Sequence, residues 1–600
     1  IQKANSGHPG LPLGSAPMAY ELWAHHMNHN PANPEWANRD RFILSGGHGS
    51  MLLYSLLHLF GYGLTKEDLM NFRQVGSLTP GHPEYGHTVG VEATTGPLGA
   101  GMGMAVGMAM AEKHLAAVFN KESYPVVDHF TYVLGGDGCM MEGISSEAFS
   151  LAGTLGLGKL IVLYDSNRIS IEGSTDIAFR ENVEERMKAF GFQTITVEDG
   201  TDIDAIGAAI EVAKADTEHP SFITIKTEIG FGCPAKQGKA SAHGEPLGVD
   251  NIKAMRETLG WQYEEPFFVP EEVYEHYSRL AEEKADVEAA WNAMFAAYCD
   301  EYPEMEKLWE QYHTAPDAKS LIENEALWLT KDKAEATRSL SGKMINILKD
   351  IMPNMIGGSA DLAPSNKTAM KDAGDFSAEN PAGRNLHFGV RELAMTAIGN
   401  GIMLHGGLRA YVATFFVFSD YVKPMARLSA LMGVPLTFVL THDSIGVGED
   451  GPTHEPIEQL AMFRAMPNFH VFRPCDATET SAAWLSAATS EKTPTALVLS
   501  RQNLNPIPGS SKDALKGGYV IDDCEGTPDA ILIASGSEVD LAVKAKAELA
   551  NEGKKIRVVS MPCMDIFEEQ SAEYKESVLP KEVRKRVIVE ALSDFGWGKY

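Results

Sequence analysis

The segment FTYVLGGDGCMMEGISSEAFSLAGTLGLGKLIVLYDSN, residues 130–167, decides the fold class. Its two ends, 130–136 and 159–167, are apolar runs rich in aromatic and β-branched residues, and they predict buried strands. A turn at 137–143 and a helical stretch at 144–156 separate them. Because strand, helix and strand alternate in this order, the segment predicts a βαβ unit and an α/β fold with parallel strands.

The same alternation extends along the chain. Residues 221–232 predict a further parallel strand, whereas 261–323 have the acidic, aromatic-rich pattern of a helical connector. Later strands are expected at 355–359, 409–415, 436–442, 495–500, 530–535, 555–560 and 586–590. We therefore expect three consecutive α/β domains with mostly parallel sheets: 1–305, which ends in the connector, 306–508, and an incomplete third domain, 509–600.

Composition limits the class of partner. The 600 residues carry a formal net charge of −30, which argues against binding to nucleic acid or to an anionic membrane. The 44% hydrophobic and 22% charged fractions are those of a soluble globular protein. The low-charge stretch 94–111 is interrupted by glycines, and we expect a closely packed helix there rather than a membrane span. The six cysteines form no CxxC pair, which indicates neither a zinc site nor a disulfide framework and fits a cytoplasmic location.

Polar residues end two neighbouring predicted strands. Asp137 follows the first strand and Asn167 ends the second, so a parallel sheet would bring both to the crevice at its carboxyl edge. With a nearby backbone carbonyl, that of Ile169, they form an all-oxygen set suited to Mg²⁺ bound to a ligand diphosphate. The alternative is that Gly136-Asp137-Gly138 is a tight turn and Asn167 a loop cap.

The glycine-rich segment 96–107 does not keep the G-x-G-x-x-G spacing of a dinucleotide site. Its small residues instead indicate a close approach, either to a diphosphate at a helix N-terminus or to a partner helix.

Histidine is the most informative residue type. Six of the 19 histidines lie in loops rich in glycine, proline or serine: His8, His48, His82, His243, His442 and His454. Neutral imidazoles suit a polyhydroxylated substrate and can move protons near neutral pH. A single loop histidine is more often structural, but six in similar contexts favour a functional role.

Three residues are candidate anion ligands: Arg338, Ser365 and Arg501. Each arginine could equally be a surface or salt-bridge residue. Glu392 lies in the first turn of an apolar helix, where it could simply face the helix dipole or could hold a shared proton beside a basic ring nitrogen.

Taken together, these motifs resemble the transketolase family of thiamine diphosphate enzymes of the pentose phosphate pathway. The resemblance extends over nearly the whole chain and rests on GDG with Asn167, SGHPG (6–10), TPGHPE (79–84), GGSADLAPSN (357–366), GVRELAM (389–395) and THDSIGVGEDGPTHEP (441–456). It implies a thiamine diphosphate-binding fold, and it implies a homodimer whose active sites are shared between subunits.

The resemblance also implies the role of each residue. Mg²⁺, with Ca²⁺ or Mn²⁺ as substitutes, would bind Asp137, Asn167 and the Ile169 carbonyl. The cofactor would contact His48, Gly96, Pro97, Leu98, Gly138 and His243, and its pyrimidine would bind Glu392, Phe415, Phe418 and Tyr421. The reaction centre would contain His8, His82, His243 and His454. Sugar hydroxyls and the terminal phosphate would bind Arg338, Ser365, His442, Asp450 and Arg501.

The reaction implied is transfer of a two-carbon ketol unit from a ketose phosphate, such as xylulose 5-phosphate, to an aldose phosphate, such as ribose 5-phosphate. Glu392 would promote formation of the cofactor ylide, and His243 with its neighbours would relay protons. The sequence departs from the family pattern in lacking the helix before IQKANSGHPG, in stopping early after WGKY and in the acidic Asp420 near the pyrimidine pocket.

Other functions compete with this one. Dihydroxyacetone synthase shares much of the constellation, and deoxyxylulose phosphate synthase is a more distant relative. A non-catalytic homologue would have no need of Glu392 or the histidines, and a nucleotide-binding oxidoreductase would need a fingerprint that the chain lacks.

Overall fold

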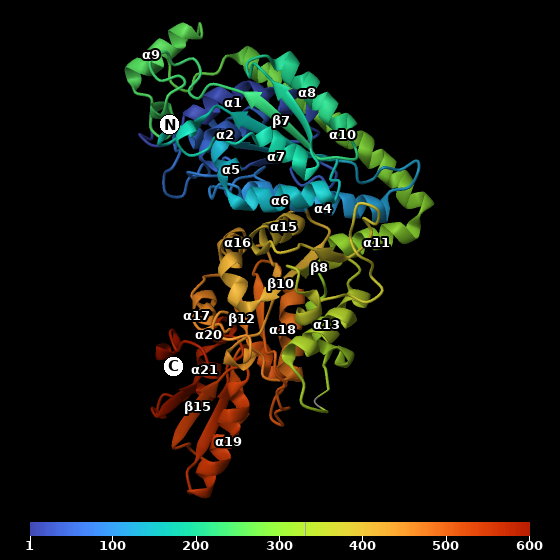
Figure 1. Cartoon of the computed structure of the whole chain (residues 1–600), viewed down its shortest axis with the longest axis vertical. Coiled ribbons are helices and arrows are strands. Elements are labelled where there is room, and N and C mark those ends of the chain that lie inside the picture. The colour runs from blue at the N-terminus through green and yellow to red at the C-terminus, as the bar shows by residue number, and fades with distance from the viewer. Residues whose placement is uncertain (331) are drawn as a thin grey trace. The chain divides into compact units, whose positions relative to one another are not determined.

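The computed structural model describes residues 1–330 and 332–600 (Figure 1). They form two compact units, one of Ile1–Trp309 with Ser377–Ala382 and one of Glu310–Phe376 with Gly383–Tyr600. The first unit contains one large sheet, and the second contains two.

The sheet of the first unit is parallel throughout, as the sequence predicts. Its strand order is β1 (Arg41–Leu44), β2 (Thr131–Gly136), β3 (Leu160–Ser166), β7 (Ser221–Lys226) and β6 (Gln193–Val197). Strand β7 ends six residues before the end of the run predicted for it, because residues 227–232 leave the sheet as loop.

Helices cover both faces of this sheet. On one face, Leu134 and Leu163 join a buried core with Trp23 and Ile206, from the segments around α1 (Gly10–Glu21) and α8 (Ile203–Ala215). Neighbouring strand residues point to the opposite face, where α4 (Ala100–Phe119) packs against β2 and α6 (Gly143–Thr154).

The glycine-rich helix α4 is almost entirely buried. At Gly101 an added Cβ would lie 2.7 Å from the Cα of Ser45, so only glycine allows the helix this close to the backbone after β1. The prediction of a closely packed helix is confirmed. No helix within the described residues is long and apolar enough to cross a membrane.

The second unit holds a six-stranded parallel sheet and a smaller mixed sheet. The large sheet has the order β12 (His470–Phe472), β13 (Thr495–Leu499), β11 (Thr437–Thr441), β10 (Arg409–Phe415), β8 (Met355–Ser359) and β9 (Asn385–His387). The small sheet has the order β14 (Tyr519–Asp522), β16 (Ile556–Ser560), β15 (Ala530–Ala534) and β17 (Arg586–Val589). Within this sheet β14 pairs antiparallel with β16, and the other pairs are parallel.

The acidic segment between the α/β domains is helical, as predicted. It forms α10 (Glu271–Glu301), α11 (Pro303–His313) and α12 (Ala318–Glu323). Most side chains of α10 are exposed or half-buried, which explains its acidic composition. All six cysteines are free.

Candidate active site

A pocket of about 390 Å³ lies at the carboxyl ends of β2 and β3 in the first unit. Asp137 is the first residue of the short helix α5 (Asp137–Met141), directly after β2, and Asn167 directly follows β3. Both line the pocket together with Ile169. The structure therefore brings the three residues of the predicted oxygen set to one place.

The side-chain oxygen atoms of Asp137 and Asn167 are held in place by hydrogen bonds. The Tyr164 hydroxyl donates to one carboxylate oxygen of Asp137, and the Arg168 backbone N–H donates to the other at 2.9 Å. The Ile169 N–H donates to Asn167 Oδ1 at 2.9 Å. Burial raises the pKa of Asp137, against the effect of its hydrogen bonds. A carboxylate, an amide oxygen and a backbone carbonyl are hard donors, so these residues fit a divalent cation such as Mg²⁺.

The cation would need ligands beyond acidic side chains. Among residues 1–330 and 332–600, no group of three or more His, Cys, Asp or Glu side chains is placed to hold a metal. The amide and carbonyl oxygens, completed by phosphate oxygens of a ligand, would have to supply the remaining coordination.

Asp165, which the sequence analysis missed, adds a second carboxyl to the pocket. Asn167 Nδ2 donates to it at 2.9 Å, and the Thr227 hydroxyl donates to its other oxygen. Burial raises the pKa of Asp165 to about 6, and the charge of nearby Asp137 adds to this effect. The available signal was its place in YDSN, two residues before Asn167 on the same strand end.

Four of the six loop histidines gather around this pocket. The ring centroid of His8 lies 5.2 Å from that of His48, 6.2 Å from that of His82 and 5.8 Å from that of His243. His48 and His243 stack at 5.0 Å. They come from segments far apart in the sequence, so the fold assembles the cluster.

All four imidazoles are held neutral. Burial, with the neighbouring histidines, lowers the pKa of His48 to about 3. Burial, with the charge of Arg73, lowers the pKa of His8 to about 4 and also lowers that of His82. Burial lowers the pKa of His243, whose Nδ1 has no hydrogen-bond partner among the described residues. Neutral rings can both donate to and accept from a ligand's hydroxyl groups.

Arg73, also missed by the sequence analysis, sets the tautomer of His8. Its Nη2 donates to His8 Nδ1 at 3.2 Å, and its Nη1 donates to the Ser6 hydroxyl at 2.9 Å. Because a guanidinium can only donate, the neutral His8 ring carries its proton on Nε2.

Small residues keep the pocket walls close together. A Cβ on Gly138 would lie 2.8 Å from Leu98 Cδ1, and one on Gly96, whose φ is 137°, would lie 3.2 Å from His82. Gly96, Leu98 and Gly138 line the pocket, with the exposed Pro97 between the first two in sequence. Side chains at the two glycines would narrow this space.

A cationic cluster occupies the strand ends of the second unit. His442 directly follows β11, Arg501 comes two residues after β13, and Arg338 lies in the first turn of α13 (Thr337–Ile351). Arg338 Nη1 donates to His442 Nε2 at 3.3 Å and to the Ser365 carbonyl, on α14 (Ala363–Asn366), at 2.9 Å. Arg501 forms an ion pair with the exposed Glu449. Guanidinium groups held in this way can form charge-assisted hydrogen bonds to an anion.

His442 is buried and neutral, and the Thr441 hydroxyl orients its ring. Burial lowers its pKa to about 3, and the charges of Arg338 and Arg501 add to this effect. Since Arg338 donates to Nε2, the proton of the ring lies on Nδ1, which is 2.8 Å from the Thr441 hydroxyl. That hydroxyl donates in turn to Asn366 Oδ1 at 2.6 Å.

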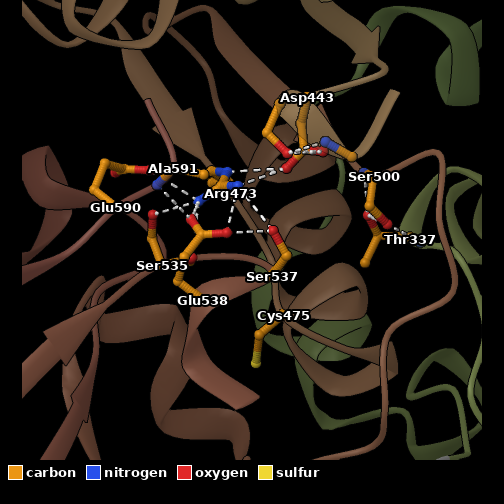
Figure 2. Close-up of polar contacts among 12 residues, drawn as sticks. Thr337, Asp443, Arg473, Cys475, Ser500, Ser535, Ser537, Glu538, Glu590 and Ala591 are labelled. Carbon is orange, nitrogen blue, oxygen red and sulfur yellow. Dashed lines mark hydrogen bonds and ion pairs between the residues drawn. The ribbon is translucent and has the colours of Figure 1, made fainter. Parts of the chain in front are cut away.

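The two arginines are tied together through the residues before them. Thr337 N–H donates to the Ser500 hydroxyl at 3.0 Å, and Ser500 N–H donates to the Thr337 hydroxyl at 2.7 Å (Figure 2). Both residues are buried. This reciprocal pair fixes the backbone from which Arg338 and Arg501 project.

An aromatic group lies beside the cationic cluster. Phe415 stacks with Phe418 at 6.1 Å between ring centroids and contacts the His442 ring at 3.7 Å. The ring centroid of Tyr421, on α16 (Ser419–Met432), lies 6.4 Å from that of Phe418.

Glu392 is the first residue of α15 (Glu392–His405), as predicted, and this helix packs against β10 and α16, which carry Phe415 and Tyr421. A carboxyl group and aromatic rings therefore belong to adjoining elements.

The remaining candidates lie on the loop after β11. The ring centroid of His454 lies 5.4 Å from that of Phe418. Asp450 is exposed. Asp420, which the sequence marks as unusual near this region, accepts hydrogen bonds from Gln459 Nε2 at 3.2 and 3.1 Å.

The candidates thus fall into two groups. The first unit holds His8, His48, His82, Gly96, Pro97, Leu98, Asp137, Gly138, Asn167, Ile169 and His243. The second unit holds Arg338, Ser365, Glu392, Phe415, Phe418, Tyr421, His442, Asp450, His454 and Arg501. His454 is therefore not in the unit that carries the other three histidines assigned to the reaction centre.

Three family descriptions match the sequence. "Transketolase, thiamine diphosphate binding domain" matches residues 1–315, "Transketolase, pyrimidine binding domain" residues 333–506 and "Transketolase-like TK C-terminal domain" residues 517–600. The transketolase of Bacillus subtilis (strain 168) is 56% identical over 606 residues, which cover 100% of this chain and 91% of that protein.

Solved structures agree in fold. The transketolase from Leishmania mexicana matches with a TM-score of 0.97 and 46% identity, covering 100% of this chain and 89% of that one. A transketolase from Pichia stipitis, solved in complex with sedoheptulose 7-phosphate, matches with a TM-score of 0.96 and 48% identity at the same coverage.

The lowered pKa of His48 predicts how stability depends on pH. Because the folded pKa of about 3 lies below the ordinary 6.5, protons bind the unfolded chain first, and stability is lost as pH falls from 6.5 towards 3. At pH 5 this one group should cost about 2 kcal/mol. In urea unfolding at pH 7 and pH 5, His48→Asn should therefore lose less free energy of unfolding between the two pH values than the unsubstituted chain.

The exposed His219 offers a matched control, since His219→Asn removes an imidazole without changing a buried site. An equal loss of stability in the His48→Asn variant and the unsubstituted chain would contradict a neutral, buried His48.

Proposed function

The chain belongs to the transketolase family and is a ketol-transferring enzyme that uses thiamine diphosphate, and we propose how its two groups of site residues divide the reaction. In this proposal the substrates are a ketose phosphate donor, such as xylulose 5-phosphate, and an aldose phosphate acceptor, such as ribose 5-phosphate. The observation that carries the proposal is the pairing of an oxygen-lined pocket ringed by neutral histidines with a separate cationic cluster.

The pocket of the first unit would hold the cofactor diphosphate and its cation. Asp137, Asn167 and the Ile169 carbonyl would bind Mg²⁺, with Ca²⁺ or Mn²⁺ as substitutes, and Gly138 leaves the pocket open beside them. The paired carboxyl groups of Asp137 and Asp165 favour a cation there. When bound, thiamine diphosphate supplies a carbon nucleophile and an electron sink for cleavage of a carbon–carbon bond.

The histidines would bind the sugar and move its protons. His8 presents an N–H at Nε2 to the pocket because Arg73 occupies its Nδ1. His8 would therefore donate a hydrogen bond to a substrate oxygen. A neutral imidazole with a free ring nitrogen can accept a hydroxyl proton as the donor sugar is cleaved and can return it to the acceptor. His243, which also lines the pocket and whose Nδ1 has no partner among the described residues, is the proton carrier that we propose, with His82 and the second unit's His454 beside the substrate.

The second unit would hold the pyrimidine ring and the substrate phosphate. Phe415, Phe418 and Tyr421 provide apolar surface for a planar ring, and the Glu392 carboxyl would hold a proton at a ring nitrogen. Arg338 and Arg501 would bind the terminal phosphate, with Ser365, His442 and Asp450 nearby.

We propose that a homodimer completes each site, one subunit providing the diphosphate pocket and the other the pyrimidine and phosphate groups. In both units large apolar side chains are exposed next to site residues: Ile171 at 69% in the first, and Val390 at 74% and Tyr421 at 61% in the second. Exposed apolar surface of this kind is typical of protein interfaces.

The wider setting that we propose is the pentose phosphate pathway in the cytoplasm. We also propose domain boundaries of 1–305, 306–508 and 509–600 for the chain.

The direct test is two-carbon transfer from xylulose 5-phosphate to ribose 5-phosphate, with Mg²⁺ and thiamine diphosphate and again with each withheld. Formation of sedoheptulose 7-phosphate that depends on the cofactor supports the proposal. Transfer only to formaldehyde would point instead to a dihydroxyacetone synthase.

Glu392→Gln should fold normally but lose turnover by about 100-fold or more, because the amide cannot hold the shared proton at the pyrimidine. Steady-state kinetics measure the turnover number, and urea unfolding checks that stability is retained. Near-normal turnover would rule out this role for Glu392.

The same variant tests the shared site. Glu392→Gln and Asp137→Asn chains, each inactive alone, should regain about a quarter of full activity when mixed at equal amounts and allowed to exchange. Half of the dimers are then mixed, and each mixed dimer contains one intact site of two. No recovery, despite exchange shown by mass spectrometry, would place both residues in a site within one chain.

Arg501→Ala should raise the KM for ribose 5-phosphate by about 10-fold or more, because a hydrogen bond to a charged group contributes about this factor to affinity. The KM for glycolaldehyde, which has no phosphate, should change little. Arg584→Ala removes an exposed arginine elsewhere in the second unit and serves as the control. Equal effects on both acceptors would contradict phosphate binding at Arg501.

A further inference from the structure

A fully buried arginine, Arg473, contacts the residue that follows His442 of the cationic cluster. Arg473 directly follows β12 and has no exposed side-chain surface. Its guanidinium contacts three carboxylates: Asp443 at 2.9 Å from Nη2 and 3.0 Å from Nε, Glu590 at 3.1 Å from Nη1, and Glu538 (Figure 2). Burial by itself lowers the pKa of Arg473, but the three carboxylates outweigh it and hold the pKa above its ordinary value.

Arg473 joins the large sheet of the second unit to the C-terminal domain. Glu538 and Glu590 belong to the C-terminal domain, and the side chain also donates to the Ser535 carbonyl at 2.9 Å and the Ser537 hydroxyl at 3.0 Å. The Arg473 backbone is held as well, because its N–H donates to the Pro562 carbonyl at 2.8 Å and its carbonyl accepts from Gly536 N–H at 2.9 Å.

A second arginine belongs to the same network. Arg464 Nη1 donates to Glu590 at 3.1 Å, and its Nη2 donates to the Ser535 hydroxyl at 3.1 Å. Two guanidinium groups thus face three carboxylates in a buried space. Such a network is often no more stabilising than apolar packing of the same volume, but its forked hydrogen bonds fix positions sharply.

Through Asp443, the network also fixes the position of His442. Asp443, which Arg473 holds by two of its nitrogens, directly follows His442. His442 has a left-handed backbone with φ of 64°. This conformation is unfavourable for a residue other than glycine and persists only where the surroundings enforce it. Asp443 anchors the chain at the residue after the strained one.

His442 in turn contacts the proposed phosphate ligand Arg338. A continuous series of contacts therefore runs from the C-terminal carboxylates through Arg473 and Asp443 to His442 and Arg338. Arg473 itself touches none of the residues that would bind phosphate.

We propose that Arg473 is a positioning residue for the substrate phosphate, through which the C-terminal domain fixes His442 and Arg338 in their binding geometry. The inference rests on the proposed function, which places the phosphate at this cluster, and extends it by giving the C-terminal domain a role in phosphate affinity.

The test is Arg473→Lys, which keeps the charge but loses the fork that reaches Asp443, Glu538 and Glu590 together. The KM for ribose 5-phosphate should rise by about 10-fold, whereas turnover and the KM for glycolaldehyde should stay within about twofold. Equal changes for both acceptors would overturn the proposal.

The chain offers a matched control at the same domain contact. Glu479 is buried and accepts from the Tyr519 hydroxyl at 2.9 Å and the Ser560 hydroxyl at 2.6 Å, both of the C-terminal domain, but it does not contact Asp443. Glu479→Ala should lower the urea midpoint without the selective rise in KM. The same selective rise in Glu479→Ala would reduce Arg473 to a merely structural role and overturn the proposal.

A second variant, Asp443→Asn, tests the proposal even if Arg473→Lys does not fold. Asp443→Asn leaves Arg473 with Glu538 and Glu590 and removes only the charged link to His442, so it should show the same selective rise, and an unchanged KM would overturn the proposal. Arg501→Ala separates the two proposals. If Arg501→Ala does not raise the KM selectively for phosphorylated acceptors, the proposed phosphate site itself is wrong. If only Arg501→Ala shows this selective rise in KM, the phosphate site stands and the role of Arg473 is wrong.

Discussion

The parallel pairing of strands is the constraint on which both groups of site residues depend. In the large sheet of the second unit, Phe415, Thr441 and Leu499 are paired across β10, β11 and β13. The residues that follow these strands therefore leave the sheet at one edge, where an aromatic ring, an imidazole and an arginine meet. A slip of one residue would turn every side chain of the strand to the opposite face and separate them.

The two groups create opposite electrostatic environments with the same residue type. Around the first pocket, histidines are neutral chiefly because they are buried beside one another, next to two carboxyl groups that favour a cation. In the second unit, His442 is also neutral, but the charges around it are those of arginines. Cofactor diphosphate and substrate phosphate would thus be neutralised by different means, one by a metal ion and the other by guanidinium groups.

The central strands and the strand-end residues could be predicted from the sequence. Of the strands at the edges of the three larger sheets, only β17 was predicted, at 586–590. β2, β3, β8, β10, β11, β13, β15 and β16 are buried and apolar, and their predicted ends lie within one residue or so of the observed ones. β1, β6, β9, β12 and β14, which the sequence did not reveal, all lie at sheet edges. Edge strands are short or polar enough to resemble loop, and their pairing depends on neighbours distant in sequence.

The same reason separates the predicted from the missed site residues. Asp137, Asn167 and the loop histidines stand in local motifs, so their chemistry could be read directly. Arg73, Asp165 and Arg473 matter through contacts with residues far along the chain, such as Thr227 and Glu538, and no local pattern marks such contacts.

The ion pair between Arg501 and Glu449 has a kinetic consequence. Glu449 lies on the same loop as His442 and is tethered close to Arg501. If Arg501 binds the substrate phosphate as proposed, an incoming phosphate would not meet a bare guanidinium but would exchange with this carboxylate. A tethered competitor acts at a high effective concentration. It would lower the affinity for every phosphorylated ligand alike, and it would pair with Arg501 again as a ligand leaves. An enzyme that must release one sugar phosphate before it binds the next benefits from a site that exchanges anions in this way.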